Sequence, residues 1–148
     1  ITLLSSKKFI DPLIEKVLIE KIPILGVCVG MQIMAKLSEE GSLEGFGWID
    51  ESVKLFKKNL NFPVPHMGWN EVVLNSPIDI FKDIKDLKFY FLHSYYFSIS
   101  KNLNKTATTN YGLDFVSAFK LNNIYGIQFH PEKSHDNGIK LLNNFCNL

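Results

Sequence analysis

The sequence predicts an α/β protein, in which helices pack against a sheet. Residues 22–27 form an apolar run with the length and branching of a buried strand, and the amphipathic pattern over residues 7–21 predicts a helix before it. Toward the C-terminus, a last helix at about 137–146 follows three strand patterns at 106–111, 115–121 and 124–130. Helices and strands in this order are typical of a sheet with helices on its faces.

The first third of the chain leads from a helix through a strand to a second helix. In the helix at 7–21, five apolar side chains share the face expected to cover the sheet: Phe9, Leu13, Ile14, Val17 and Leu18. After the strand at 22–27, the pattern predicts, in order, a helix at 30–37, a loop at 43–48 and a strand at 49–56.

The middle of the chain alternates polar turns with apolar runs. Residues 57–61 are expected to form a solvated turn rather than a nucleic-acid patch. Beyond Pro63 and Pro65, the pattern predicts, in order, a loop at 66–69, a strand at 71–74, a short helix or turn at 76–86 and one buried strand at 88–98. His66 and His93 are expected to be structural histidines with hydrogen-bond partners. In the last helix, Ile139, Leu142, Phe145 and Cys146 are expected to face the sheet.

Cys28 ends the apolar strand and is bracketed by Gly26 and Gly30. A strand that turns sharply into a helix tolerates little bulk beside the turning residue, which explains glycine on both sides. Such an elbow places the sulfur at a helix N-terminus, where the thiolate is expected to be favoured, and leaves the Val29 N–H free for an oxyanion. The alternative is a small buried core cysteine.

A second group of polar residues follows the last strand. Pro131 ends strand pairing, so His130 and Glu132 are expected to project from the carboxyl end of the strand, where open parallel sheets carry their active sites. Cys28, His130 and Glu132 then form a nucleophile, a general base and an orienting group.

Four motifs in this order resemble a known family. GVCVGMQ at 26–32 and FHPE at 129–132 resemble the class I glutamine amidotransferases, and VPHMGWN at 64–70 and FYFLHSYY at 89–96 resemble the glutaminase subunits of imidazole glycerol phosphate synthase. The resemblance implies a three-layer α/β fold, a mixed sheet with helices on both faces. It also implies that residues 1–148 are one glutaminase domain whose first strands and glycine-rich oxyanion loop precede Ile1.

The implied reaction is hydrolysis of glutamine to glutamate and ammonia, with Cys28, His130 and Glu132 as the triad and Val29 in the oxyanion hole. Gln32, in the first helical turn, is expected either to contact the amino-acid end of the substrate or to be an exposed helix glutamine. No cofactor is needed for this chemistry. The resemblance also implies a cyclase subunit as heterodimer partner, contacted by Met67, Trp69, Tyr90 and Lys133.

Two alternatives stay open. The loop at 45–49, and valines at 27 and 29, depart from the histidine-pathway pattern, so the ammonia could instead serve an amidotransferase that acts on nucleotide-linked sugars. A chain without the oxyanion loop could also act only as a non-catalytic partner-binding remnant.

Composition excludes several other classes of protein. Sixteen basic and 15 acidic residues leave a net charge of +1, and all the basic ones are lysine, so neither a nucleic acid nor an anionic membrane is an expected partner. No transmembrane span, signal peptide or metal-ligand spacing occurs in the sequence. Two cysteines do not make a disulfide framework and suit a reducing cytoplasm.

Overall fold

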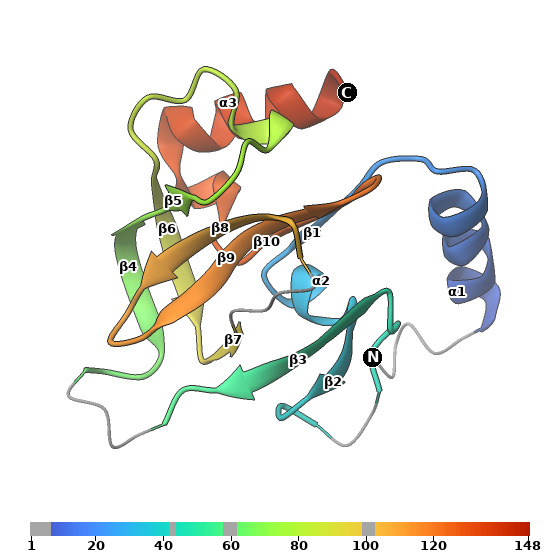
Figure 1. The fold of residues 1–148 in the computed structure, drawn as a ribbon, viewed down its shortest axis with the longest axis horizontal. Helices are drawn as coiled ribbons and strands as arrows, with labels where there is room; N and C mark the ends of the chain where they lie inside the picture. Colours follow the sequence, from blue (N-terminus) through green and yellow to red (C-terminus); the bar gives the residue numbers. More distant parts are fainter. Residues whose placement is uncertain (1–6, 42–43, 58–61, 99–102) are drawn as a thin grey trace.

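The computed structural model describes residues 7–41, 44–57, 62–98 and 103–148, and it has the predicted α/β fold (Figure 1). The helices are α1 (Lys7–Ile14), which continues into a π-helical turn at Glu15–Ile19, α2 (Val29–Gln32) and α3 (His135–Cys146). The strands are β1 (Ile24–Val27), β2 (Ala35–Ser38), β3 (Ile49–Leu55), β4 (His66–Glu71), β5 (Val73–Leu74), β6 (Lys88–His93), β7 (Tyr95–Phe97), β8 (Lys105–Asn110), β9 (Asp114–Leu121) and β10 (Ile124–Ile127). Single turns of 3-10 helix lie at Asp79–Phe81 and Pro131–Lys133.

The main sheet is mixed. Its strand order is β1-β10-β9-β7-β3-β2, with β8 paired to β9 and β5 paired to β8. The pairs β1/β10 and β2/β3 are parallel, whereas the other pairs are antiparallel. Strands β4 and β6 form a separate antiparallel ladder. The mixed sheet agrees with the expectation from sequence.

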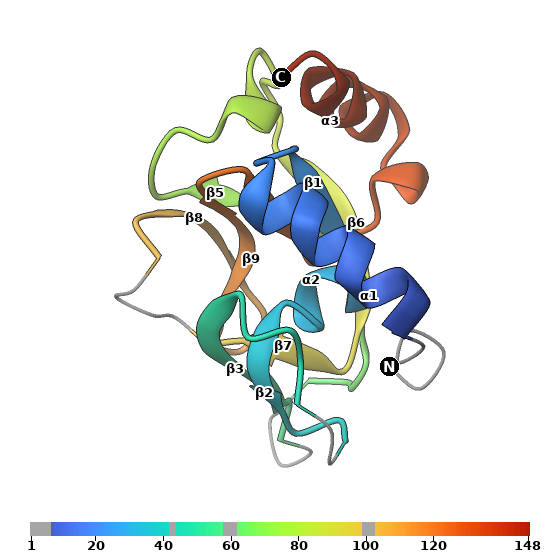
Figure 2. The ribbon, with the colours of Figure 1, turned by 90° about the vertical axis from the view of Figure 1, so that its right-hand side faces the viewer.

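Helices pack on both faces of the main sheet. Residues adjacent in β9 belong to different core clusters, since Phe115 packs in one cluster and Val116 in the other. Leu141 of α3 lies in the first cluster, and Val17, just after α1, lies in the second. Accordingly, α1 and α3 lie on different sides of the sheet in Figures 1 and 2. The layered arrangement that the motifs implied is confirmed.

The second helix is much shorter than predicted. Helix α2 ends at Gln32, and by Ala35 the chain has become strand β2, which pairs with β3. Residues 31–37 have helical apolar spacing, yet residues 35–38 adopt an extended form and pair their backbone with β3. Tertiary pairing therefore overrides a weak local preference.

Two further expectations from sequence are wrong. Residues 66–69 are not a loop but the start of β4, and the single strand expected at 88–98 breaks at Ser94 into β6 and β7. The break is required because β6 pairs with β4, whereas β7 pairs with β3 and β9 in the other sheet. Of the turn expected at 57–61, residues 58–61 lie outside the described part of the chain.

The side of α3 predicted to face the sheet is only partly correct. Leu142 and Phe145 are half-buried, but Ile139 is 61% exposed and Cys146 is exposed. The helix begins at His135, and its fully buried side chain is Leu141. The sheet side of the helix is therefore centred on Leu141.

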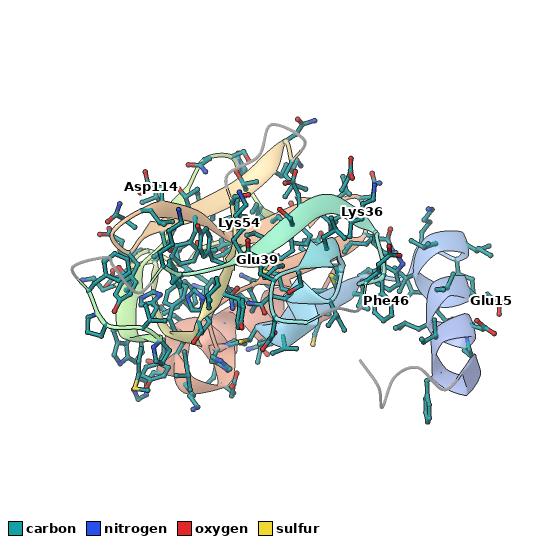
Figure 3. All side chains as sticks on the ribbon, turned by 90° about the horizontal axis from the view of Figure 1, so that it is seen from below. Glu15, Lys36, Glu39, Phe46, Lys54 and Asp114 are labelled. Atoms are coloured by element: carbon teal, nitrogen blue, oxygen red, sulfur yellow. The ribbon has the colours of Figure 1, made fainter. Side chains whose placement is uncertain are left out.

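The β2–β3 edge of the sheet is charged. Figure 3 shows Lys36, Glu39 and Lys54 along this edge. The carboxylate of Glu39 accepts a hydrogen bond of 2.7 Å from the Leu55 N–H. Charged side chains on an edge strand discourage pairing with another chain.

Candidate active site

Strands β1 and β10 bring the two halves of the site to one edge of the sheet. They run in parallel, with Val27 opposite Ile127, and the Cys28 N–H donates to the Ile127 carbonyl at 2.8 Å. The residues that follow the two strands, Cys28 on one and Gln128 to His130 on the other, therefore leave the sheet side by side. The carboxyl ends of these strands are where the sequence predicted the site.

Cys28 occupies a strained elbow. Its φ of 50° and ψ of −109° lie in a region that side-chain-bearing residues rarely adopt. A Cβ on Gly26 would lie 2.6 Å from the Gly30 carbonyl oxygen, so glycine is required at 26. A Cβ on Gly30 would meet nothing within 4 Å, so steric exclusion does not explain that glycine, contrary to expectation.

Strand β6 holds both Cys28 and His130. The Cys28 thiol lies 3.8 Å from the Leu92 carbonyl, and the His130 N–H donates to the Tyr90 carbonyl at 2.8 Å. Since these carbonyls belong to residues two apart on one strand, the nucleophile and base candidates are neighbours. Strand β6 is thus the backbone support of the site.

His130 is oriented by Glu132. Its Nδ1 lies 2.7 Å from Glu132 Oε1, across the single helical turn that Pro131 begins. Its Nε2 is buried and has no hydrogen-bond partner among the described residues. An imidazole bound on one nitrogen and unpaired on the other can exchange a proton with a substrate or a thiol.

The thiol itself is not as acidic as expected. Burial raises the pKa of Cys28 above its ordinary value, and the carboxylates of Glu132 and Glu40 add to that rise, whereas hydrogen bonds from the Val29 N–H and Gln128 lower it. Burial outweighs the helix terminus because α2 is only one turn long, so its dipole is small. The predicted preference for thiolate is therefore wrong for the isolated thiol.

Gln32 is not an exposed helix glutamine, which was one of its two expected roles. It is only 5% exposed, and its Nε2 donates to the Tyr95 carbonyl and to Gln128 Oε1, both at 2.9 Å. Gln128 is completely buried, and its Nε2 donates to the Cys28 sulfur at 3.5 Å. Sequence reasoning missed Gln128, although an amide between apolar residues in a strand pattern signals a buried hydrogen-bonding group.

The four residues expected at a partner interface come together on one surface. Met67 and Trp69, on β4, are 60% and 49% exposed. Trp69 pairs with Tyr90 on β6, and their rings make an edge contact at 6.3 Å. The Lys133 ammonium lies 5.6 Å from the centroid of the Tyr90 ring. This surface, hereafter the β4 face, adjoins the site because Tyr90 also binds the His130 backbone.

His66 and His93 are buried, as expected of structural histidines. Their rings are joined by a bond of 2.9 Å from His66 Nδ1 to His93 Nε2, and His93 Nδ1 lies 2.7 Å from the Tyr95 carbonyl. Burial lowers the pKa of His66 to about 4 and that of His93 to about 3. Both rings are therefore neutral near pH 7.

The described part of the chain has neither a grouping of metal ligands nor a membrane-spanning helix. There, no three His, Cys, Asp or Glu residues are grouped so as to hold a metal ion. None of the helices described is both long enough and apolar enough to span a bilayer.

Known proteins resemble this chain along most of its length. The family model described as "Glutamine amidotransferase class-I" matches residues 7–148. The imidazole glycerol phosphate synthase subunit HisH of Leptospira borgpetersenii is 49% identical over 93% of this chain and 70% of its own length. HisH of Leptospira interrogans is 46% identical over 98% of this chain and 73% of its own.

A solved glutamine amidotransferase from Thermotoga maritima shares the fold. Its TM-score is 0.60 at 23% identity, over 97% of this chain and 56% of that structure.

The family match and these relatives define the class of protein. The chain belongs to the class-I glutamine amidotransferase family, a family of enzymes. Within that family it is similar to the HisH subunits of imidazole glycerol phosphate synthase from several organisms.

Proposed function

We propose that this chain is the glutaminase subunit of an imidazole glycerol phosphate synthase. It hydrolyses the side-chain amide of glutamine and passes the ammonia to a cyclase subunit, with which it forms a heterodimer in histidine biosynthesis. The observation that carries the proposal is the joint anchoring of Cys28 and His130 on β6, with the unpaired Nε2 of His130 in the site.

The first half of the reaction uses His130 as base and then as acid. His130 Nε2 takes the Cys28 proton as the sulfur attacks the amide carbon, which forms a C–S bond and an oxyanion. A buried thiol with a raised pKa needs such a base, because little thiolate is present without it. The oxyanion collapses, the C–N bond breaks, and His130 returns the proton to the departing ammonia.

In the second half, water cleaves the thioester. His130 removes a proton from the attacking water, and a second oxyanion forms. Its collapse breaks the C–S bond and releases glutamate, and His130 returns its proton to the Cys28 sulfur. Glu132 keeps the imidazole oriented and stabilises its charged form through the 2.7 Å contact. Val29 N–H is the proposed oxyanion donor, and one such donor is worth ~10² to 10³ in rate.

Gln32 is proposed to contact the amino-acid end of glutamine. Its side chain donates to the Tyr95 carbonyl and to Gln128, and Gln128 in turn donates to the Cys28 sulfur. Replacement by leucine is expected to raise KM for glutamine more than it lowers kcat, because the contact is made equally in the ground state and the transition state.

The β4 face is the proposed docking surface for the cyclase. Exposed methionine and tryptophan side chains are typical interface anchors, and here they lie on β4, the strand paired with β6, which supports the site. The two free cysteines, Cys28 and Cys146, suit a reducing cytoplasm, which is the proposed location.

Glutamate release from glutamine, measured with and without the cyclase subunit, tests the proposal. Turnover that the cyclase stimulates, and that Cys28→Ala abolishes while Cys146→Ala retains, is the expected result. Stimulation by an amidotransferase that acts on nucleotide-linked sugars instead would assign the ammonia to a sugar pathway. Tight cyclase binding without any turnover would leave only a partner-binding role.

A further inference from the structure

A largely buried polar network runs from Asn70 on β4 to the Cys28 sulfur. Asn70 Nδ2 lies 3.2 Å from His66 Nε2, and the two histidines lead on to the Tyr95 carbonyl. That carbonyl also accepts from Gln32, whose Nε2 donates in turn to Gln128 Oε1. Gln128 ends the network at the sulfur.

The groups at the two ends of the histidine pair, Asn70 and the Tyr95 carbonyl, both require His66 and His93 to carry their protons on Nδ1. Asn70 Oδ1 accepts from the Glu71 N–H, so its Nδ2 faces His66 and must donate to Nε2. His66 then carries its proton on Nδ1 and donates to His93 Nε2, which leaves the His93 proton on Nδ1 to meet the Tyr95 carbonyl. A carbonyl can only accept, so both ends require this one arrangement.

The same reasoning fixes the amide of Gln128. Tyr95 O is an acceptor, so the amide nitrogen of Gln32 must point toward it and toward Gln128. Gln128 therefore turns its oxygen to Gln32 and its N–H to the sulfur. A donor held in this orientation stabilises a negative sulfur more than a neutral one.

Resting on the proposed role of Cys28 as nucleophile, we propose that Gln128 is a positioning residue of this enzyme. Its buried N–H holds the Cys28 sulfur in place and stabilises the thiolate, and Gln32 and Tyr95 keep it turned toward the sulfur. The group is completely buried, so water does not replace the lost donor when the side chain is changed.

The site has a reason to need such a donor. Burial raises the pKa of Cys28, and Glu132 and Glu40 act in the same direction, whereas the Gln128 hydrogen bond acts against them. The other titratable groups around the sulfur are His130 beyond β10 and His93 on β6, and His93 is neutral near pH 7. Gln128 is therefore an uncharged side chain that opposes the burial cost of the thiolate.

The test measures the thiol directly, without glutamine. In a Cys146→Ala background, the rate of Cys28 alkylation by iodoacetamide is followed against pH, since only the thiolate reacts. Gln128→Met has a similar volume but no donor. It is expected to raise the pH midpoint of the alkylation profile by about one pH unit, and to lower the alkylation rate at a fixed pH below that midpoint about tenfold. Gln128→Glu is expected to raise it further, because a carboxylate replaces the donor.

Asn144→Leu is the matched control. Asn144 also makes two hydrogen bonds, to the Ile80 and Lys82 carbonyls, but lies on α3 and touches no part of the site. It is expected to lower the melting temperature without moving the midpoint. An unmoved midpoint in Gln128→Met, with the melting temperature lowered as in the control, would make Gln128 merely structural and overturn the proposal.

Gln32→Met provides a second route should Gln128→Met not fold. It leaves Gln128 in place but removes the group that orients it, so the midpoint is again expected to rise, and a constant midpoint contradicts the network. If the wild-type chain hydrolyses no glutamine, the proposed function fails, whereas the alkylation profile still reports on the Gln128 contact. The two failures are thus distinguishable.

Discussion

The backbone of Gly30 closes over Gly26 so tightly that a Cβ on Gly26 would lie 2.6 Å from the Gly30 carbonyl oxygen. This contact sets the angle at which β1 turns into α2, and thereby the position of Cys28. Because the obstacle is backbone, it cannot rotate away as a side chain could.

Gly26→Ala is therefore expected to lower the free energy of unfolding by about 2 to 4 kcal/mol, since the elbow must open to admit the methyl group. Gly30→Ala is the control, because a Cβ there meets nothing within 4 Å, and a change within about 1 kcal/mol is expected. Urea unfolding followed by circular dichroism compares the two. Equal losses in both variants would refute the steric explanation.

The buried histidines predict a loss of stability in mild acid. Burial holds the pKa of His66 at about 4 and that of His93 at about 3, whereas both are near 6.5 in the unfolded chain. Below pH 6.5 the unfolded state binds more protons than the folded state. The free energy of unfolding therefore falls as pH is lowered from 6.5 toward 4, and the contribution of the two histidines is fully present above pH 6.5. At full effect His66 contributes roughly 3 kcal/mol and His93 roughly 5 kcal/mol.

Urea midpoints between pH 4 and pH 7.5 measure this slope. His93→Phe should flatten it, whereas replacing His135, which is exposed, with glutamine should not. A slope that survives in His93→Phe at its full size would assign the acid sensitivity to other groups.

Glu132→Gln tests the orienting carboxylate. The variant keeps the shape of the side chain but loses its charge, so kcat/KM for glutamine is expected to fall by about 10² to 10⁴, with KM little changed. Glu20→Gln removes an exposed carboxylate paired with Lys16 and is expected to leave turnover unchanged. A fall below threefold in Glu132→Gln would mean that His130 needs no partner.

Trp69→Ala tests the β4 face. Half of this ring is exposed and it stacks on His135 at 5.2 Å, so its loss is expected to cost little stability but to weaken cyclase binding at least tenfold. Titration calorimetry with the cyclase subunit measures the effect. Phe9→Ala, which removes an even more exposed aromatic ring from α1, should bind as the wild type does. Unchanged binding in Trp69→Ala would move the interface elsewhere.

Local sequence pattern was sufficient to find the residues that are proposed to carry the chemistry. Cys28 could be found because an elbow leaves a mark in sequence, glycine at a fixed spacing after an apolar run, and His130 because Pro131 marks the end of a strand. The glycine explanation held for Gly26 alone, since the two positions look alike in sequence and differ only in what surrounds them.

Features that depend on strand pairing could not be predicted from the sequence of a single segment. The spacing of Met31, Met34 and Leu37 is helical, and only the partner strand β3 reveals β2. In the same way, the apolar run around Ser94 gave no sign that its halves serve different sheets. Gln128 was missed for a related reason, because its role depends on Gln32 and Cys28, which lie far from it in the chain.

The parallel pairing of β1 with β10 also governs when the site comes into being. Cys28 and Gln128 are 100 residues apart in sequence, so the loop between them must close before nucleophile, base and amide can meet. Contacts of such long range form slowly and close to the end of folding. In a refolding experiment, the return of slow, native-like alkylation at Cys28 should therefore lag behind the return of helical circular dichroism. The alkylation rate of Cys28 would then report when the site forms during refolding.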